Sequence, residues 1–72
     1  MKSTLDLIKL AGLKTNLSVD ANNYSTLDLI KIVGFVGIHQ RHLTIRNAQV
    51  KSTLDLMKIV STYGEFVTLD FS

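Results

Sequence analysis

The chain has 72 residues and a formal net charge of +2, and it contains neither cysteine nor proline. This length suits a single domain with a small core, which no disulfide and no thiolate-bound metal can reinforce. Because 46% of the residues are apolar, the composition excludes a disordered chain, and the weak positive charge does not by itself predict nucleic-acid binding.

The apolar residues do not form a segment that could cross a membrane. The longest nearly apolar run covers residues 32–38, whereas a membrane helix needs about 20 residues. The sequence passes from Met1 straight into a repeated phrase and shows no apolar core of a signal peptide. These features predict a soluble, cytoplasmic protein without a membrane partner.

The same short phrase occurs three times, as KSTLDLIK at residues 2–9, YSTLDLIK at 24–31 and KSTLDLMK at 51–58. In each copy a serine stands three residues before an aspartate, which is the spacing of a capping box at a helix start. The aspartate also lies where the helix dipole favours negative charge. The predicted capping residues are Ser3, Asp6, Ser25, Asp28, Ser52 and Asp55. We therefore predict three helices, with the leucines of each phrase in the core.

The second predicted helix is more apolar than the third. Wound at about 100° per residue, the third helix gathers its polar residues on one face, opposite Leu56 and Ile59. In the second helix Phe35 interrupts the polar face, and apolar residues cover the remainder. A helix that is apolar on nearly all sides requires cover on nearly all sides. This pattern predicts self-association through apolar helix faces, with the second helix as the main contact.

A segment with alternating apolar and polar residues follows each helix, at residues 16–20, 43–46 and 66–70. This period of two is typical of a strand that is covered on one face. Glycines near the helix ends are predicted to close the helices in the left-handed conformation. These glycines are Gly12, Gly34, Gly37 and Gly64.

The resulting order, αβαβαβ, predicts an α/β or α+β fold with a three-stranded sheet and all helices on one face. The single domain would consist of three helix–strand repeats, at residues 1–23, 24–50 and 51–72. Strand alternation fits both a parallel sheet and an antiparallel or mixed one, so the strand direction stays open.

Residues 50–70 combine a Lys51-Ser52 helix start, Gly64 and a Val-Thr-Leu segment. This part of the chain resembles the second helix and following strand of the histidine-containing phosphocarrier (HPr) family. The resemblance implies that Ser52 stands at the family's regulatory serine. Residues 37–41 (GIHQR) look like the family's phosphohistidine motif, which implies a phosphate-accepting role for His39. The family continues this motif with proline, where the present chain has His42.

The only local basic cluster consists of His39, Arg41, His42 and Arg46. The spacing of the two histidines would suit a shared metal ion if they lay on a helix. They precede a predicted strand, however, and no carboxylate or thiolate lies beside them. We therefore predict that both histidines lie in a surface loop and bind no metal. The cluster is a candidate for binding RNA or another anionic partner, although no aromatic platform accompanies it. Nucleic-acid binding is therefore the less favoured expectation.

Catalytic motifs are absent from the sequence. The repeated serines lack a nucleophile elbow, and the repeated aspartates are explained by helix capping. We therefore predict a non-catalytic αβ-repeat module that self-associates, without a cofactor or a small-molecule substrate. The near-identical phrases and the lack of proline are typical of an engineered or reconstructed sequence. The alternatives are an HPr-like phosphocarrier or regulatory domain, acting through His39 or Ser52, and a nucleic-acid binder that uses the basic loop.

Overall fold

The computed structural model describes residues 2–13 and 15–71. In these residues helices and strands alternate along the chain, as predicted. The helices are α1 (Thr4–Gly12), α2 (Thr26–Ile38) and α3 (Thr53–Ile59), and the strands are β1 (Leu17–Asp20), β2 (Leu43–Arg46) and β3 (Val67–Leu69). Short 3₁₀ turns are η1 (Ala21–Asn23), η2 (Ala48–Val50) and η3 (Gly64–Phe66).

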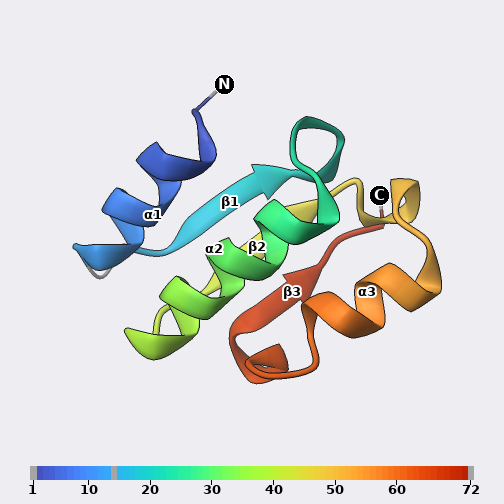
Figure 1. Ribbon diagram of the computed structural model, residues 1–72. Coiled ribbons are helices and arrows are strands. Elements are labelled where there is room, and N and C mark those ends of the chain that lie inside the picture. Colours follow the sequence, from blue (N-terminus) through green and yellow to red (C-terminus); the bar gives the residue numbers. More distant parts are fainter. Residues whose placement is uncertain (1, 14, 72) are drawn as a thin grey trace.

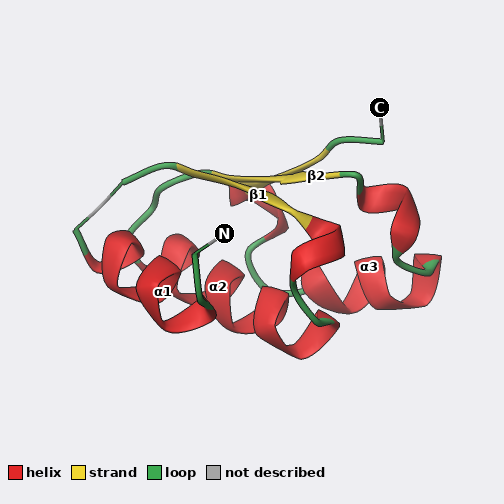
Figure 2. Cartoon of the chain, turned by 90° about the horizontal axis from the view of Figure 1, so that it is seen from above, coloured by secondary structure: helices red, strands yellow, loops and turns green. Residues whose placement is uncertain are grey.

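The three strands form one parallel sheet in the order β1-β2-β3 (Figure 1). Leu17 lies opposite Leu43, and Leu43 lies opposite Val67. Figure 2 shows all three helices beneath one face of this sheet, while the other face carries none of the described helices. The α/β fold with a single helical layer is thus confirmed, and of the two strand directions left open by the sequence, the parallel one is found.

Each helix begins at the predicted serine. The backbone N–H of Asp6 donates to the Ser3 hydroxyl oxygen at 3.1 Å. The same bond joins Asp28 to Ser25 at 3.2 Å and Asp55 to Ser52 at 3.1 Å. All three serines have extended backbone angles, as an N-cap requires. The repeated phrase is therefore a helix-starting sequence in each of its copies.

The phrase leucines divide between the core and the surface, which corrects the prediction that all of them are buried. The second leucine of each phrase is buried: Leu7, Leu29 and Leu56. The first leucine is exposed, by 61% at Leu5, 71% at Leu27 and 62% at Leu54. Residues two apart on a helix point about 200° away from each other, so only one of the two leucines can face the sheet.

The predicted role of the glycines is also wrong. None of the four glycines has a positive φ, and the described residues in the left-handed region are Gln40 and Asn47. The helices end instead at Leu13, His39 and Val60, whose φ lies near −90°. Tight bonds such as Leu13 N–H to the Leu10 carbonyl, at 3.0 Å, close the last turn. Helix α2 does end with a left-handed residue, but this residue is Gln40 rather than a glycine, and the Arg41 N–H beside it donates to the Val36 carbonyl at 3.0 Å.

Helix α2 lies between α1 and α3 (Figure 1) and packs against both. Its buried residues are Leu29, Ile32, Val33, Val36 and Gly37. The central position explains part of the unusual apolarity of this helix, because neighbours within the same chain cover it on two sides. Leu27, Phe35 and Ile38 stay exposed on α2. Of the apolar side chains of this helix, only these three bear on the predicted self-association.

Candidate functional site

The structure separates the four residues of the predicted basic cluster. His39 ends α2, Arg41 and His42 lie just before β2, and Arg46 is the last residue of that strand. At about 3.3 Å per residue, a strand of this length places the Cα atoms of His42 and Arg46 about 13 Å apart. Arg46 therefore lies at the opposite end of the sheet from the other three residues, and the four side chains do not make one patch.

His42 connects the strands. Its backbone N–H donates to the side-chain carbonyl of Asn16 at 2.9 Å, before β1. Its ring Nε2 lies 2.5 Å from the Thr68 hydroxyl on β3. In the part of the chain that the structure describes, no group of three or more His, Cys, Asp or Glu residues is placed to hold a metal ion. The contacts of His42 are those of a residue that holds neighbouring strands together.

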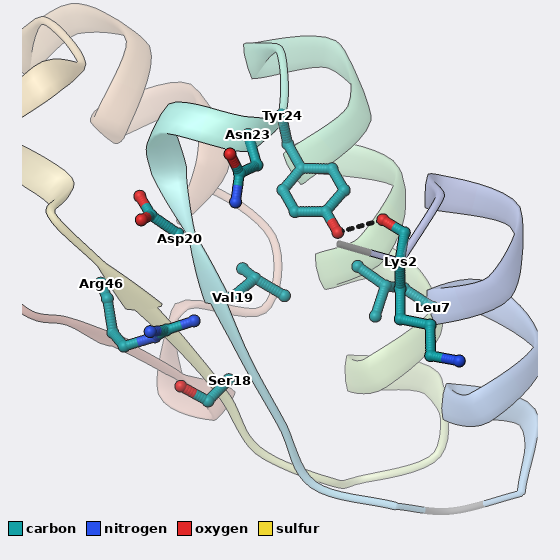
Figure 3. A pocket seen from close by; sticks show the side chains of 8 residues that line it. All are labelled: Lys2, Leu7, Ser18, Val19, Asp20, Asn23, Tyr24 and Arg46. Atoms are coloured by element: carbon teal, nitrogen blue, oxygen red, sulfur yellow. Dashed lines mark hydrogen bonds between the residues drawn. The ribbon is translucent and has the colours of Figure 1, made fainter.

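Arg46 lies beside a carboxylate. In the sheet register it is opposite Asp20 of β1, and Figure 3 shows both side chains on the same side of β1. A cavity of about 140 Å³ follows the edge of β1. It is lined by Lys2, Leu7, Ser18, Val19, Asp20, Asn23, Tyr24 and Arg46. The proximity of Asp20 reduces the net positive charge that Arg46 can offer to a phosphate.

The pKa of the Asp20 carboxyl is lowered from its ordinary value of 3.8. The main cause is the backbone N–H of Asn22, which donates to the carboxylate at 2.9 Å. The side chain of Asn47 and the guanidinium of Arg46 act in the same direction. Because the ionised form is favoured in the folded state, Asp20 stabilises the fold at pH values above 3.8, and this contribution is lost as the pH falls through the lowered pKa.

We expect Asp20→Asn to lower the melting temperature at pH 7 and to make the acid dependence of stability shallower. Asparagine keeps an oxygen acceptor for the Asn22 N–H but loses the charge. The difference between the native chain and the variant should shrink as the pH falls below about 4. Thermal melts followed by circular dichroism from pH 7 to pH 2 test this. A difference that stays constant over this range would contradict the assigned role of the charge.

The two residues highlighted by the phosphocarrier resemblance lie at opposite ends of the helical layer. His39 ends α2, whereas Ser52 precedes the first turn of α3. Helices α1, α2 and α3 each lead into a strand of one parallel sheet, so their first turns share one edge of the molecule. A helix as long as α2 spans about 20 Å. His39 and Ser52 are therefore separated by about this distance along the direction of the helices. A phosphocarrier role for His39 or Ser52 stays a prediction, as does RNA binding by the basic loop.

The outer surface of the helical layer carries a regular set of apolar side chains. Leu5, Leu27 and Leu54 occupy the same position in the three phrases and are exposed; we call them the leucine row. A row of exposed lysines lies one turn further along the helices, at Lys9, Lys31 and Lys58. A second cavity, of about 150 Å³, lies between α2 and α3 and is lined largely by apolar groups such as Ile30 and Val33. This surface combines apolar area with charge of both signs.

Comparison with protein-family models, curated proteins and solved structures gives no match for this chain. None of the helices in residues 2–13 and 15–71 has the length and apolarity that crossing a membrane requires. A functional proposal therefore depends on the surface geometry of the chain itself.

Sequence reasoning missed the leucine row because it assigned every phrase leucine to the core. The period of the helix contains the signal, since Leu-x-Leu cannot place both side chains on one face. It also missed the position before each capping serine, held by Lys2, Tyr24 and Lys51. A long side chain with a polar end stands there in every copy.

Proposed function

We propose that this protein is a non-catalytic αβ-repeat structural module that self-associates through the outer surface of its helical layer. The leucine row is the observation that carries the proposal. Exposed single leucines are common on protein surfaces, but large contiguous apolar patches mark interaction sites. Here three leucines repeat at equivalent positions on adjacent helices, with Phe35 and Ile38 of α2 also exposed.

The charges on this surface favour a second copy as the partner. Each phrase places an aspartate three residues before a lysine, so parallel rows of negative and positive charge cross the helices. In a dimer, the helical layers of two copies would face each other, with the two-fold axis running across the helices midway between the two rows. Rotation about this axis places the lysine row of one copy opposite the aspartate row of the other. An interface between identical surfaces is self-complementary in this way.

The dimensions of the molecule agree with this mode of association. Its principal extents are 30 × 25 × 20 Å. Its broad face is therefore comparable with the roughly 800 Å² that each partner buries in a typical stable complex. Because α2 lies in the middle of the layer, Leu27 is expected at the centre of the contact, where truncation costs the most affinity.

We expect Leu27→Gln to weaken self-association at least about tenfold, because burying an amide without a partner opposes the contact. Sedimentation equilibrium across a concentration series measures this effect. The matched control is Val50→Gln, since Val50 is also exposed but belongs to η2 rather than to the helical layer. A native chain that stays monomeric at about 1 mM, or equal effects of the two substitutions, would contradict the proposal.

A further inference from the structure

A hydrogen bond between adjacent repeats occurs twice at equivalent positions. The Tyr24 hydroxyl donates to the backbone carbonyl of Lys2. In the next repeat, the Lys51 ammonium donates to the backbone carbonyl of Tyr24 at 2.8 Å. All three residues immediately precede a capping serine. Each repeat thus donates to the carbonyl of the repeat before it, and we call this series the inter-repeat ladder.

The ladder has an unused donor at one side of the molecule and an equivalent acceptor at the other. Among residues 2–13 and 15–71, the Lys2 ammonium makes no hydrogen bond and is exposed. The backbone carbonyl of Lys51 is the position that a further repeat would use. A second copy placed beside α3 could therefore donate from its own Lys2 to Lys51.

Both outer strands of the sheet, β1 and β3, direct backbone hydrogen-bonding groups away from the molecule. The Leu17 N–H donates to the His42 carbonyl at 2.9 Å, so the alternate residue Ser18 directs its backbone groups to the outer edge of β1. On β3 the Asp70 N–H donates to the Ile45 carbonyl at 2.9 Å, so Leu69 directs its backbone groups outward. Parallel edges with such groups are templates for another strand. The cavity along β1 lies beside Ser18 (Figure 3).

The helical layer shows a matching difference between the inner and outer repeats. Ile8, Ile30 and Met57 hold the same position in the three phrases. Ile8 and Ile30 are half-buried, whereas Met57 on α3 is 60% exposed. In a repeat array each unit covers the flank of its neighbour, and a terminal unit without a polar cap leaves that flank uncovered. Met57 marks such a flank.

We propose that copies of this chain stack head to tail, with α3 and β3 of one copy against α1 and β1 of the next. The stacked copies continue the inter-repeat ladder, the parallel sheet and the helical layer with the relation that joins the repeats within one chain. The two contacting surfaces differ, so the assembly is open-ended rather than a closed dimer. It uses the ends of the repeat array and does not involve the leucine row, so it stands independently of the proposed function.

One charge contact opposes this stacking at low salt. Asp70 follows Leu69, whose partner in the register is Ile45, and its backbone bonds to Ile45 and Ala48 place it alongside the end of β2, near Arg46. In a stack it would be next to Asp20 of the following copy. Like charges on adjacent strands repel each other, and salt screens the repulsion. Stacking should therefore strengthen with salt and in an Asp70→Asn variant.

The test uses two variants that block different ends, both in a Leu27→Gln background so that the leucine row does not contribute. Ser18→Pro removes the outward N–H of β1, and proline is tolerated on edge strands. Met57→Glu places a charge on the flank of α3. Sedimentation velocity in about 0.5 M NaCl, where the Debye length is about 4 Å, gives the size distribution.

The Leu27→Gln chain should form a series of species that lengthens with concentration, and each blocked variant should be monomeric. Mixing the two blocked variants should give a 1:1 dimer and nothing larger, because each supplies the end that the other lacks. Ser18→Thr, which keeps the N–H, should still form the series. If Ser18→Pro melts below the assay temperature, Lys2→Glu replaces it as the block of the same end.

Three results would overturn the proposal. These are a monomeric Leu27→Gln chain at about 1 mM in high salt, association that persists in the folded blocked variants, and a mixture that contains no heterodimer. A native chain that dimerises only through the leucine row would give the first result, so failure of the stacking is distinguishable from failure of the proposed function.

Discussion

Replacing Leu29 by alanine is expected to reduce the free energy of unfolding by about 2–5 kcal/mol, because it leaves a cavity in the core. Leu29 is fully buried in α2, the central helix of the layer. Small domains have total stabilities of only about 5–15 kcal/mol, so this single change should remove a large share of the stability of the protein. Urea unfolding followed by circular dichroism measures the loss.

The other leucine of the same phrase provides the control. Leu27→Ala changes the same residue type two positions away, but Leu27 is exposed. Its effect on the unfolding of the monomer should stay within about 0.5 kcal/mol, as is usual for surface positions. The comparison is made at a concentration low enough to keep the chain monomeric. Equal losses in the two variants would show that the assignment of inner and outer leucines is wrong.

Replacing Gly37 by alanine is expected to destabilise the fold by about 1–3 kcal/mol, which is the usual range for overpacking. Gly37 is buried in α2, and a Cβ atom there would lie 2.6 Å from the Cβ of Tyr63 and 2.5 Å from its Cδ1. The first of these atoms is fixed to the backbone, so the turn before η3 must shift. Chemical denaturation of the purified variant measures the cost.

Gly34 is the matched control within the same helix. A Cβ atom at Gly34 meets no atom within 4 Å apart from its chain neighbours and the nearby backbone of its own helix, and alanine is favoured over glycine in a helix by roughly 0.5–1 kcal/mol. Gly34→Ala should therefore stabilise the protein while Gly37→Ala destabilises it. Two effects of the same sign would mean that helix propensity, rather than the contact with Tyr63, decides the result at Gly37.

Much of the fold could be predicted from local patterns. Ser3, Ser25 and Ser52 specify where the helices begin, because the capping interaction involves only residues three apart. Alternation at residues 43–46 specifies a strand with one covered face in the same local way. The single helical layer follows from that one-sided alternation. These predictions succeeded because each depends on contacts within a few residues of sequence.

The candidate surfaces were harder to predict. The sequence places His39 and Arg46 close together, but a helix end and a whole strand separate their positions in space. The leucine row and the inter-repeat ladder depend on adjacent repeats being held side by side. The ladder, for example, joins Tyr24 to Lys2 and Lys51 to Tyr24 across the width of the layer. No local pattern contains such a distance.

The sequence by itself determined the helix starts, the strands and their repetition, because capping and periodicity are short-range properties of the chain. Only the tertiary structure decided that the sheet is parallel, that Gly37 must lack a side chain, and that one leucine of each phrase stays in solvent. These features depend on which element packs beside which, and that is settled when the whole core is assembled. The surfaces proposed for association belong to this second group.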